Sequence, residues 1–297
     1  MRKTLFFLIM SVVFVFGSCK CNSKNNSNND EKDSSFVAKL PSIVKIEDKL
    51  FNVPSPLQAS EFIKNQNIVF DIDLLNSPDN YSKYLTTFKQ ALNLGVYGAD
   101  LGNLFINEQL SKSSEYFNVI KKLSEQVGIL SVLDQNLVDR IDANTNNKDS
   151  LIFLTSGVFR DIDNYLLKNA QKDVGVLIIT GGWIESFYYL LKIAVKNDNP
   201  EIISKIGEQK NPLNNIINLL QPYYNQKSDD FDILHEELVN LSIIFDSIEE
   251  NYIYEDTETD ANKKITIIHS TTTYNVSENI LAELDKSVER IRNWIIE

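Results

Sequence analysis

Apolar residues recur at the three- and four-residue spacing of an amphipathic helix along most of the chain. The stripe near the C-terminus contains Leu281, Leu284, Val288, Ile291 and Ile295. A second stripe contains Phe117, Ile120, Leu123 and Val127, and the next residue, Gly128, is typical of a helix end. Glycine and proline number only 10 and 7, which disfavours a turn-rich β protein. The pattern predicts an all-α fold, a multi-helix array or bundle of about ten helices.

Polar residues stand where several of these helices are expected to begin. Ser77-Pro78 combines a capping residue with a first-turn proline and predicts a helix running to about Leu94. The same signal occurs at Asn199-Pro200 and Asn211-Pro212. Asn275, three residues before Glu278, has the spacing of a capping box and is expected to open the last helix.

Three segments depart from the helical pattern. Residues 36–56 contain three prolines and predict an extended lead-in. Residues 264–274 are rich in threonine and isoleucine, which favours a short β-hairpin there. The acidic stretch 254–263, just before it, is expected to be an exposed loop.

Two parts of the chain share a residue pattern that indicates an internal duplication. Gly98 and Gly181 are 83 residues apart, and the same offset relates Lys122 to Lys205. At an offset of 84, Asp79-Asn80-Tyr81 matches Asp163-Asn164-Tyr165. We expect one repeat at about 79–137, a second at about 162–220, and C-terminal helices at about 229–297. The alternative is chance similarity between two leucine-rich helical stretches.

The N-terminus has the features of an export signal. A basic start, Met1-Arg2-Lys3, precedes an apolar run from Leu5 to Phe16 that is too short for a comfortable membrane span. The following quartet, Phe16-Gly17-Ser18-Cys19, resembles the bacterial lipobox, with Phe16 where leucine is more usual. We expect residues 1–18 to be a lipoprotein signal peptide and Cys19 to carry the lipid. The alternative is an ordinary signal peptide with a chance cysteine.

The next residues predict how the folded part is held. Residues 19–35 are polar and rich in asparagine, typical of a flexible tether, and residues 36–297 form a single helical domain. The expected partner is a lipid bilayer, reached through Cys19. The acidic Asp30 and Glu31 come late for a surface-export signal, so both faces of an outer membrane stay open.

Charge and cysteine content narrow the function. The formal net charge is -12, which disfavours nucleic-acid binding and attraction to anionic lipid headgroups. Its simplest effect is to keep an exported protein soluble. The two cysteines, Cys19 and Cys21, both lie at the processing site, so the body has no disulfide if Cys19 is acylated.

Two unusual stretches supply the candidate binding residues. Residues 95–102 contain three glycines, which either permit close helix packing or leave bare backbone beside a bound group anchored by Asp100. At the 83-residue offset Trp183 takes the place of Asp100, so an aromatic side chain and a carboxylate could line one pocket. The candidate ligand-binding residues are Tyr97, Asp100, Trp183 and Glu185. The alternative is that they are packing residues or pair with other side chains.

Motifs for catalysis and metal binding are weak. His235-Glu236 suggests a zincin, but Val239 stands where the second histidine belongs, and only His269 remains elsewhere. We therefore assign no catalytic residue, no metal ligand and no cofactor, and consider an enzyme the less favoured class.

The lipobox quartet, the tether and the stretches 95–102 and 181–185 resemble a group of helical lipoproteins of unknown function of the Bacteroidetes type. The resemblance covers most of residues 50–296 and implies a helical fold and a cell-envelope address, without catalytic residues. The first hypothesis is a binding or scaffolding lipoprotein that takes a small ligand or an envelope protein at the seam between the repeats. The alternatives are an enzyme, such as a hydrolase using carboxylates, and a purely structural envelope component.

Overall fold

The computed structural model describes residues 43–46, 49–129, 139–141, 143–144, 147, 150–154, 171–197, 199–260 and 265–297. Its longer helices are α2 (Pro56–Asn65), α3 (Thr87–Ile106), α4 (Leu110–Gln126), α7 (Lys172–Lys196), α8 (Pro200–Gly207), α9 (Lys210–Leu220), α10 (Asp229–Phe245) and α11 (Glu278–Ile296). Short 3-10 helices are η1 (Ile72–Leu74), η2 (Pro78–Lys83) and η4 (Gln221–Tyr223). The strands are β1 (Ile43–Ile46), β2 (Lys49–Asn52), β3 (Glu249–Ile253), β4 (Glu258–Asp260), β5 (Ile265–Ile267) and β6 (Thr271–Asn275). The predicted all-α, multi-helix architecture is confirmed.

The centre of the molecule is the contact between α3 and α7. A Cβ added to Gly95 would lie 2.0 Å from the carbonyl oxygen of Ile178, and one added to Gly181 would lie 1.9 Å from that of Leu92. Neither position has room for a side chain, so the two backbones touch. The close-packing interpretation is therefore correct for Gly95.

Helix α7 is apolar over almost its whole circumference because other elements surround it. Among the described residues it has the length and composition of a membrane span, but 83% of its most apolar window is buried inside the protein. Helices α3, α11, α2, α8 and α9 all contact it. The burial is that of a core helix in a globular fold.

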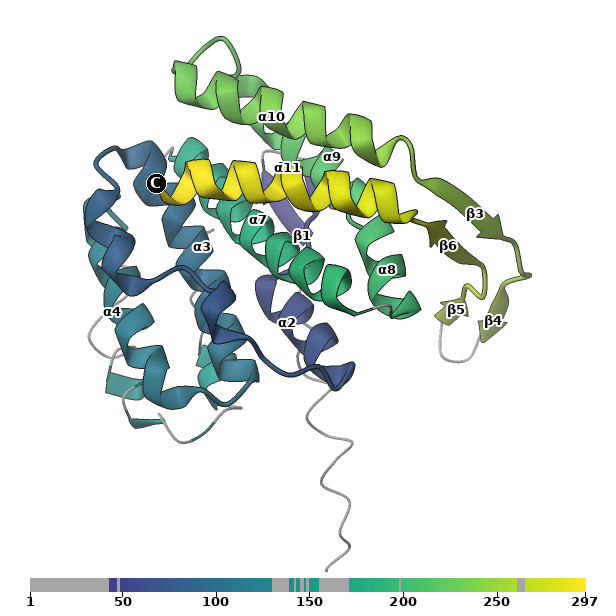
Figure 1. Ribbon diagram of the computed structural model, residues 1–297, viewed down its shortest axis with the longest axis horizontal. Helices are drawn as coiled ribbons and strands as arrows, with labels where there is room; N and C mark the ends of the chain where they lie inside the picture. The colour runs from purple at the N-terminus through teal and green to yellow at the C-terminus, as the bar shows by residue number, and fades with distance from the viewer. Residues whose placement is uncertain are drawn as a thin grey trace, which may run out of the picture.

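The C-terminal helix α11 lies along α7, and α10 packs on α9 and α11 (Figure 1). Two ion pairs show that α7 and α11 run antiparallel: Glu185 pairs with Arg292, and Lys192, seven residues later, pairs with Asp285, seven residues earlier. Helix α4 packs on α3 at the left of the view, on the side of the molecule away from strands β3 to β6 (Figure 1). The predicted stripe of α11 is confirmed, since Leu284, Val288, Ile291 and Ile295 are buried and Leu281 is partly buried against the core.

A long hairpin projects from the helical body between α10 and α11 (Figure 1). Strand β3 pairs with β6 and strand β4 pairs with β5, both antiparallel. A hairpin is confirmed here, and the segment expected to form it, 264–274, contains strands β5 and β6. These two strands form the C-terminal half of a longer hairpin, and their partners β4 and β3 come from residues 249–260. The stretch expected to be an acidic loop therefore contributes β4.

The observed helix ends correct three of the expected caps. Ser77-Pro78 opens only the 3-10 helix η2, and the helix that reaches past Leu94 starts after the N-cap Thr86. Ser277, whose hydroxyl accepts from the Ile280 N–H, caps the last helix in place of Asn275. The third correction is at Asn211-Pro212, where Asn211 lies inside α9, which begins at Lys210 after the N-cap Gln209.

Other local expectations agree with the structure. Asn199 caps α8 by accepting from the N–H groups of Glu201 and Ile202, with Pro200 in the first turn. Gly128 follows α4 with a φ of 80°, in the left-handed region that glycine adopts without strain. The expected extended lead-in contains the antiparallel pair β1 and β2, and α2 starts at Pro56 after the N-cap Ser55.

The internal duplication stays a prediction. The glycine-containing helices α3 and α7 occupy corresponding places and pack on each other. At the 83-residue offset, however, residues 107–109 between α3 and α4 correspond to residues 190–192 inside α7, so the helix ends differ. Residues 130–137 and 162–170 of the two expected copies lie outside the described residues.

Candidate functional site

A cleft of about 410 Å³ opens between α2, α7, α8, α9 and β6. Its apolar wall is formed by Phe62, Trp183, Phe187, Leu190 and Tyr274. Its polar groups come from Asn52, Gln58, Ser186, Lys205, Glu208, Gln209 and Asn211. A concave, mostly apolar surface with a few polar groups is the usual form of a small-molecule site.

The deep wall of the cleft is held by ring stacking and hydrogen bonds. The Trp183 ring stacks on Phe187 with ring centroids 5.2 Å apart, and its indole Nε1 donates to Gln209 Oε1 at 3.1 Å. Gln209 in turn donates from Nε2 to the Lys205 carbonyl oxygen at 3.2 Å. Both polar ends of the Gln209 side chain are therefore used to hold the wall in place. The hydrogen bond orients the Trp183 indole, and the apolar ring lines the cleft.

The charged groups at the cleft neutralise each other. Lys205 Nζ lies 2.6 Å from Glu208 Oε2, one helical turn further along the chain. The same ammonium lies 5.4 Å from the centroid of the Phe62 ring. The cleft therefore combines an apolar wall with amides and an internal ion pair, a surface that suits an uncharged ligand with several hydrogen-bonding groups.

Tyr274 ties the cleft to the hairpin. It lies on β6, opposite Glu250 of β3, and its side chain packs against Gly207 at the end of α8. A Cβ on Gly207 would lie 2.3 Å from Tyr274 Cβ, so the glycine is what lets the ring reach the helix. The hairpin thereby supplies one wall of the cleft.

A second polar cluster lies in the core, on another face of α7. Arg292 of α11 donates from Nε and Nη2 to the two Glu185 oxygens, each at 2.7 Å, and from Nη2 to the Leu74 carbonyl oxygen at 3.0 Å. The guanidinium lies 4.1 Å from the Tyr188 ring centroid. Burial lowers the pKa of Arg292, but the adjacent Glu185 carboxylate outweighs this effect and the pKa is raised. The pair is a buried, bidentate ion pair.

Asp100 faces this pair from α3. Its Oδ2 accepts from the Asn76 backbone N–H at 3.0 Å, and no part of the residue is exposed. Burial, followed by repulsion from the Glu185 carboxylate, raises the pKa of Asp100 well above its usual range. No described group donates to Oδ1. Protonation resolves this deficit, because the acid form can donate its proton to the Glu185 carboxylate.

A tyrosine layer closes the cluster from the side of α4. Tyr97 donates to the Ser77 carbonyl oxygen at 2.8 Å and packs edge-to-face on Tyr116. Tyr84 accepts from Asn76 Nδ2 at 3.0 Å. Burial raises the pKa of all three phenols, so they stay neutral. The side chains of the cluster are all buried, with Arg292 and Tyr116 keeping only 6% and 5% of their surface exposed.

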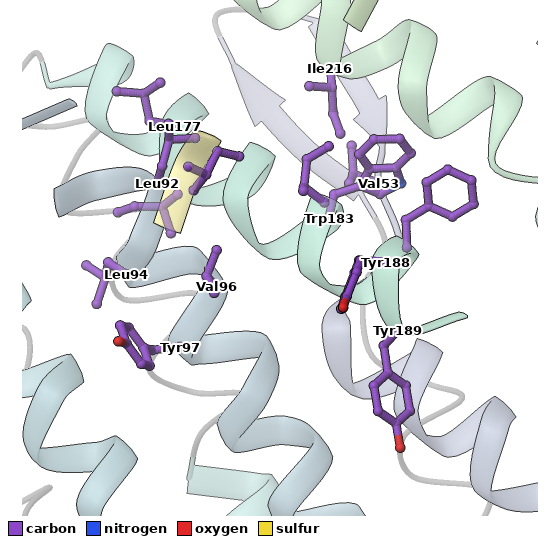
Figure 2. Packing of buried hydrophobic residues seen from close by; sticks show 14 of the residues in the cluster. Val53, Leu92, Leu94, Val96, Tyr97, Leu177, Trp183, Tyr188, Tyr189 and Ile216 are labelled. Carbon is purple, nitrogen blue, oxygen red and sulfur yellow. The ribbon is translucent and has the colours of Figure 1, made fainter. Parts of the chain in front are cut away.

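The structure separates the four predicted site residues into two places. Tyr97, Asp100 and Glu185 belong to the core cluster, whereas Trp183 lines the cleft. Figure 2 shows Trp183 on the part of α7 near Val53 and Ile216, and Tyr97 on the neighbouring helix α3. A single pocket lined by both Asp100 and Trp183 was expected, but the described cleft is lined by Trp183 and not by Asp100. Trp183 and Glu185 are two positions apart on α7, and side chains at that spacing point to different faces of a helix.

Sequence reasoning missed Arg292 and most of the cleft. One signal was available for Arg292: it lies one helical turn after Val288, beside an apolar stripe, and a cation there needs a buried carboxylate. No comparable signal marks Phe62 or Tyr274, because their partners come from distant elements.

His235, the histidine of the weak zincin pattern, is buried. Its ring stacks on Tyr224 with ring centroids 4.5 Å apart, and burial lowers its pKa.

No group of three or more His, Cys, Asp or Glu side chains that could hold a metal occurs in the described part of the chain. Comparison of the chain with protein families, with curated proteins and with solved structures finds no match.

Proposed function

We propose that the protein is an exported lipoprotein of the bacterial cell envelope, anchored through Cys19, whose helical body binds a small uncharged ligand in the cleft at Trp183. The cleft is the observation that carries the binding function. Its volume of about 410 Å³ lies within the range of small-molecule sites. The expected ligand has an apolar face to lie against the aromatic wall and hydroxyl or amide groups for the polar side chains.

The position of the titratable groups supports binding over catalysis. The carboxyl group with the raised pKa, Asp100, is fully buried in the core and lines no part of the cleft. General acid–base catalysis requires such a group within reach of the substrate. The arrangement therefore favours the binding hypothesis over the hydrolase hypothesis.

A blocking variant tests the ligand site. Thermal unfolding of residues 20–297 is measured with neutral disaccharides and with neutral tripeptides, which distinguish a glycan ligand from a peptide ligand. A ligand that binds the native state raises the unfolding temperature. Ala59→Phe fills the cleft and should abolish this rise, whereas the matched change Ala282→Phe on the exposed surface of α11 should preserve it. A rise that survives in Ala59→Phe would place the ligand elsewhere, and no rise with either ligand class would reject the proposed ligand chemistry.

A pair of cysteine variants tests the anchor. The proposal rests on the basic start, the apolar run and the small residues before Cys19. In a producing bacterium, Cys19→Ala should release the protein from membranes and abolish labelling with a fatty-acid probe. Cys21→Ala, a matched change two positions later, should leave both unchanged. Labelling that persists in Cys19→Ala would reject the anchor and leave the ligand proposal standing.

A further inference from the structure

Exposed apolar side chains concentrate on the hairpin that projects from the helical body. Thirteen large apolar residues are exposed in the described part of the chain, and six lie within residues 252–268. They are Tyr252, Ile253, Tyr254, Ile265, Ile267 and Ile268, with exposed fractions from 44% to 70%. Such a concentration on a thin two-stranded element indicates a contact surface, because neighbouring apolar residues usually find cover.

The hairpin also has an open edge. Strand β6 pairs with β3 on one side and contacts α8, whereas no described strand pairs with the outer edge of β3. The outward N–H and C=O groups of β3 can therefore pair with an added strand. Natural proteins usually protect such an edge with charged residues, proline or a bulge. On β3 the charge is confined to Glu249 and Glu250 at its start, and Asn251, Tyr252 and Ile253 carry none.

Charge decides which strand fits. Residues 249–275 contain six acidic residues and two lysines, and four of the acids, Glu249, Glu250, Glu258 and Asp260, lie on β3 and β4. A second copy of the chain would place these carboxylates against one another, which is unfavourable. Anionic lipid and nucleic acid are disfavoured for the same reason. A basic partner gains attraction at the same surface.

We propose that the outer edge of β3 binds an extended segment of a partner protein in which basic residues alternate with apolar ones. The segment adds as a third strand and its backbone pairs with β3. Because successive side chains of a strand point to opposite faces, its apolar side chains all lie on the face that carries Ile253. Its basic side chains lie on the other face, where the Glu250 carboxylate attracts them and their aliphatic stems cover Tyr252. Backbone pairing supplies affinity, while the side chains on the two faces supply selection. This surface is distinct from the cleft, which Tyr274 lines from β6.

Three synthetic peptides test the proposal on residues 20–297. The first alternates lysine and valine, the second alternates glutamate and valine, and the third is the lysine peptide with every second valine replaced by proline. The third keeps the full charge but cannot pair as a strand. Fluorescence anisotropy should show the first peptide binding at least about tenfold more tightly than either of the others. Equal binding of the proline peptide would overturn strand addition and leave only charge attraction.

Matched surface variants locate the contact. Ile253→Ser on β3 combined with Tyr252→Ser should weaken the lysine–valine peptide about tenfold or more. Ile243→Ser on α10, which is 60% exposed, as Tyr252 is, should leave the affinity unchanged. Equal loss in both variants would overturn the assignment, as would sedimentation showing a dimer that Tyr252→Ser dissolves. Binding to zwitterionic vesicles that depends on Tyr252 would also overturn it, in favour of a lipid surface.

Discussion

The residues on two faces of α7 have opposite surroundings: one face packs against other elements, and the other borders a cleft. On one face Glu185 is 1% exposed and every polar contact is internal, to Arg292 and through it to Leu74. On the other face Trp183 is almost as buried, yet its ring borders a cleft of about 410 Å³. The comparison shows that burial of a polar residue does not by itself mark a site. What distinguishes the two faces is whether neighbouring elements fill the space in front of the side chain.

The largest expected effect comes from breaking the ion pair on the closed face. Arg292→Met leaves the Glu185 carboxylate buried without its cation, which should lower the free energy of unfolding by about 3–5 kcal/mol. Urea unfolding measures the loss. The double variant Arg292→Met with Glu185→Leu removes both charges and should recover most of the stability. A loss below about 1 kcal/mol for the single variant would contradict a buried pair.

The next effect tests the backbone contact that closes this face. Gly95→Ala places a Cβ 2.0 Å from the Ile178 carbonyl oxygen and should cost about 3 kcal/mol, at the upper end for overpacking. Gly102→Ala is the matched control, because its Cβ meets only the Leu57 side chain at 3.2 Å, which can shift. Urea unfolding should give Gly95→Ala a clearly lower free energy of unfolding than Gly102→Ala. The reverse order would contradict the observed α3–α7 contact.

Asp100 should give the closed face a distinctive pH dependence. Its pKa in the folded state lies above the ordinary value of 3.8, so the native state holds a proton that the unfolded chain releases. This contribution to stability is complete below about pH 4 and decreases as the pH rises through the folded-state pKa. Asp100→Asn keeps an acceptor for Asn76 and a donor for Glu185, and should remove that decrease at a cost of no more than about 1 kcal/mol. An unchanged pH profile in this variant would show that Asp100 is ionised in the fold.

The smallest expected effect is at the rim of the open face. Lys205→Met removes a partly exposed ion pair with Glu208 and should change the free energy of unfolding by less than about 1 kcal/mol. Binding of an uncharged ligand should remain, with little dependence on salt. Calorimetric titration at two salt concentrations measures both. A tenfold loss of affinity would show that the ligand carries negative charge.

Much of the fold could be predicted from local pattern. The stripes in α4 and α11, the helix end at Gly128 and the cap at Asn199 follow from periodicity and backbone hydrogen bonding within a few residues. The N-cap at Ser277 was missed because Asn275 and Ser277 are both good capping residues, and the pairing of Asn275 with Glu249 in the hairpin decides between them. The strand at 265–267 was visible from its residues, whereas its partner β4 was not.

The candidate site could be predicted only in part. Tyr97, Asp100, Trp183 and Glu185 stood out because polar, aromatic or glycine-flanked positions in an apolar helix need a reason. Their division between a buried cluster and a cleft could not be read from the chain, since it depends on Arg292, Phe62 and Tyr274 arriving from other elements.

The amino-acid sequence by itself determined the helical periodicity, the glycines that permit close contact, the acidic charge and the residues on which export is proposed. Tertiary structure alone decided which face of α7 is closed and which is open. The physical reason is that side-chain spacing is set by the local helix, whereas the space in front of a side chain is set by whichever distant element packs there.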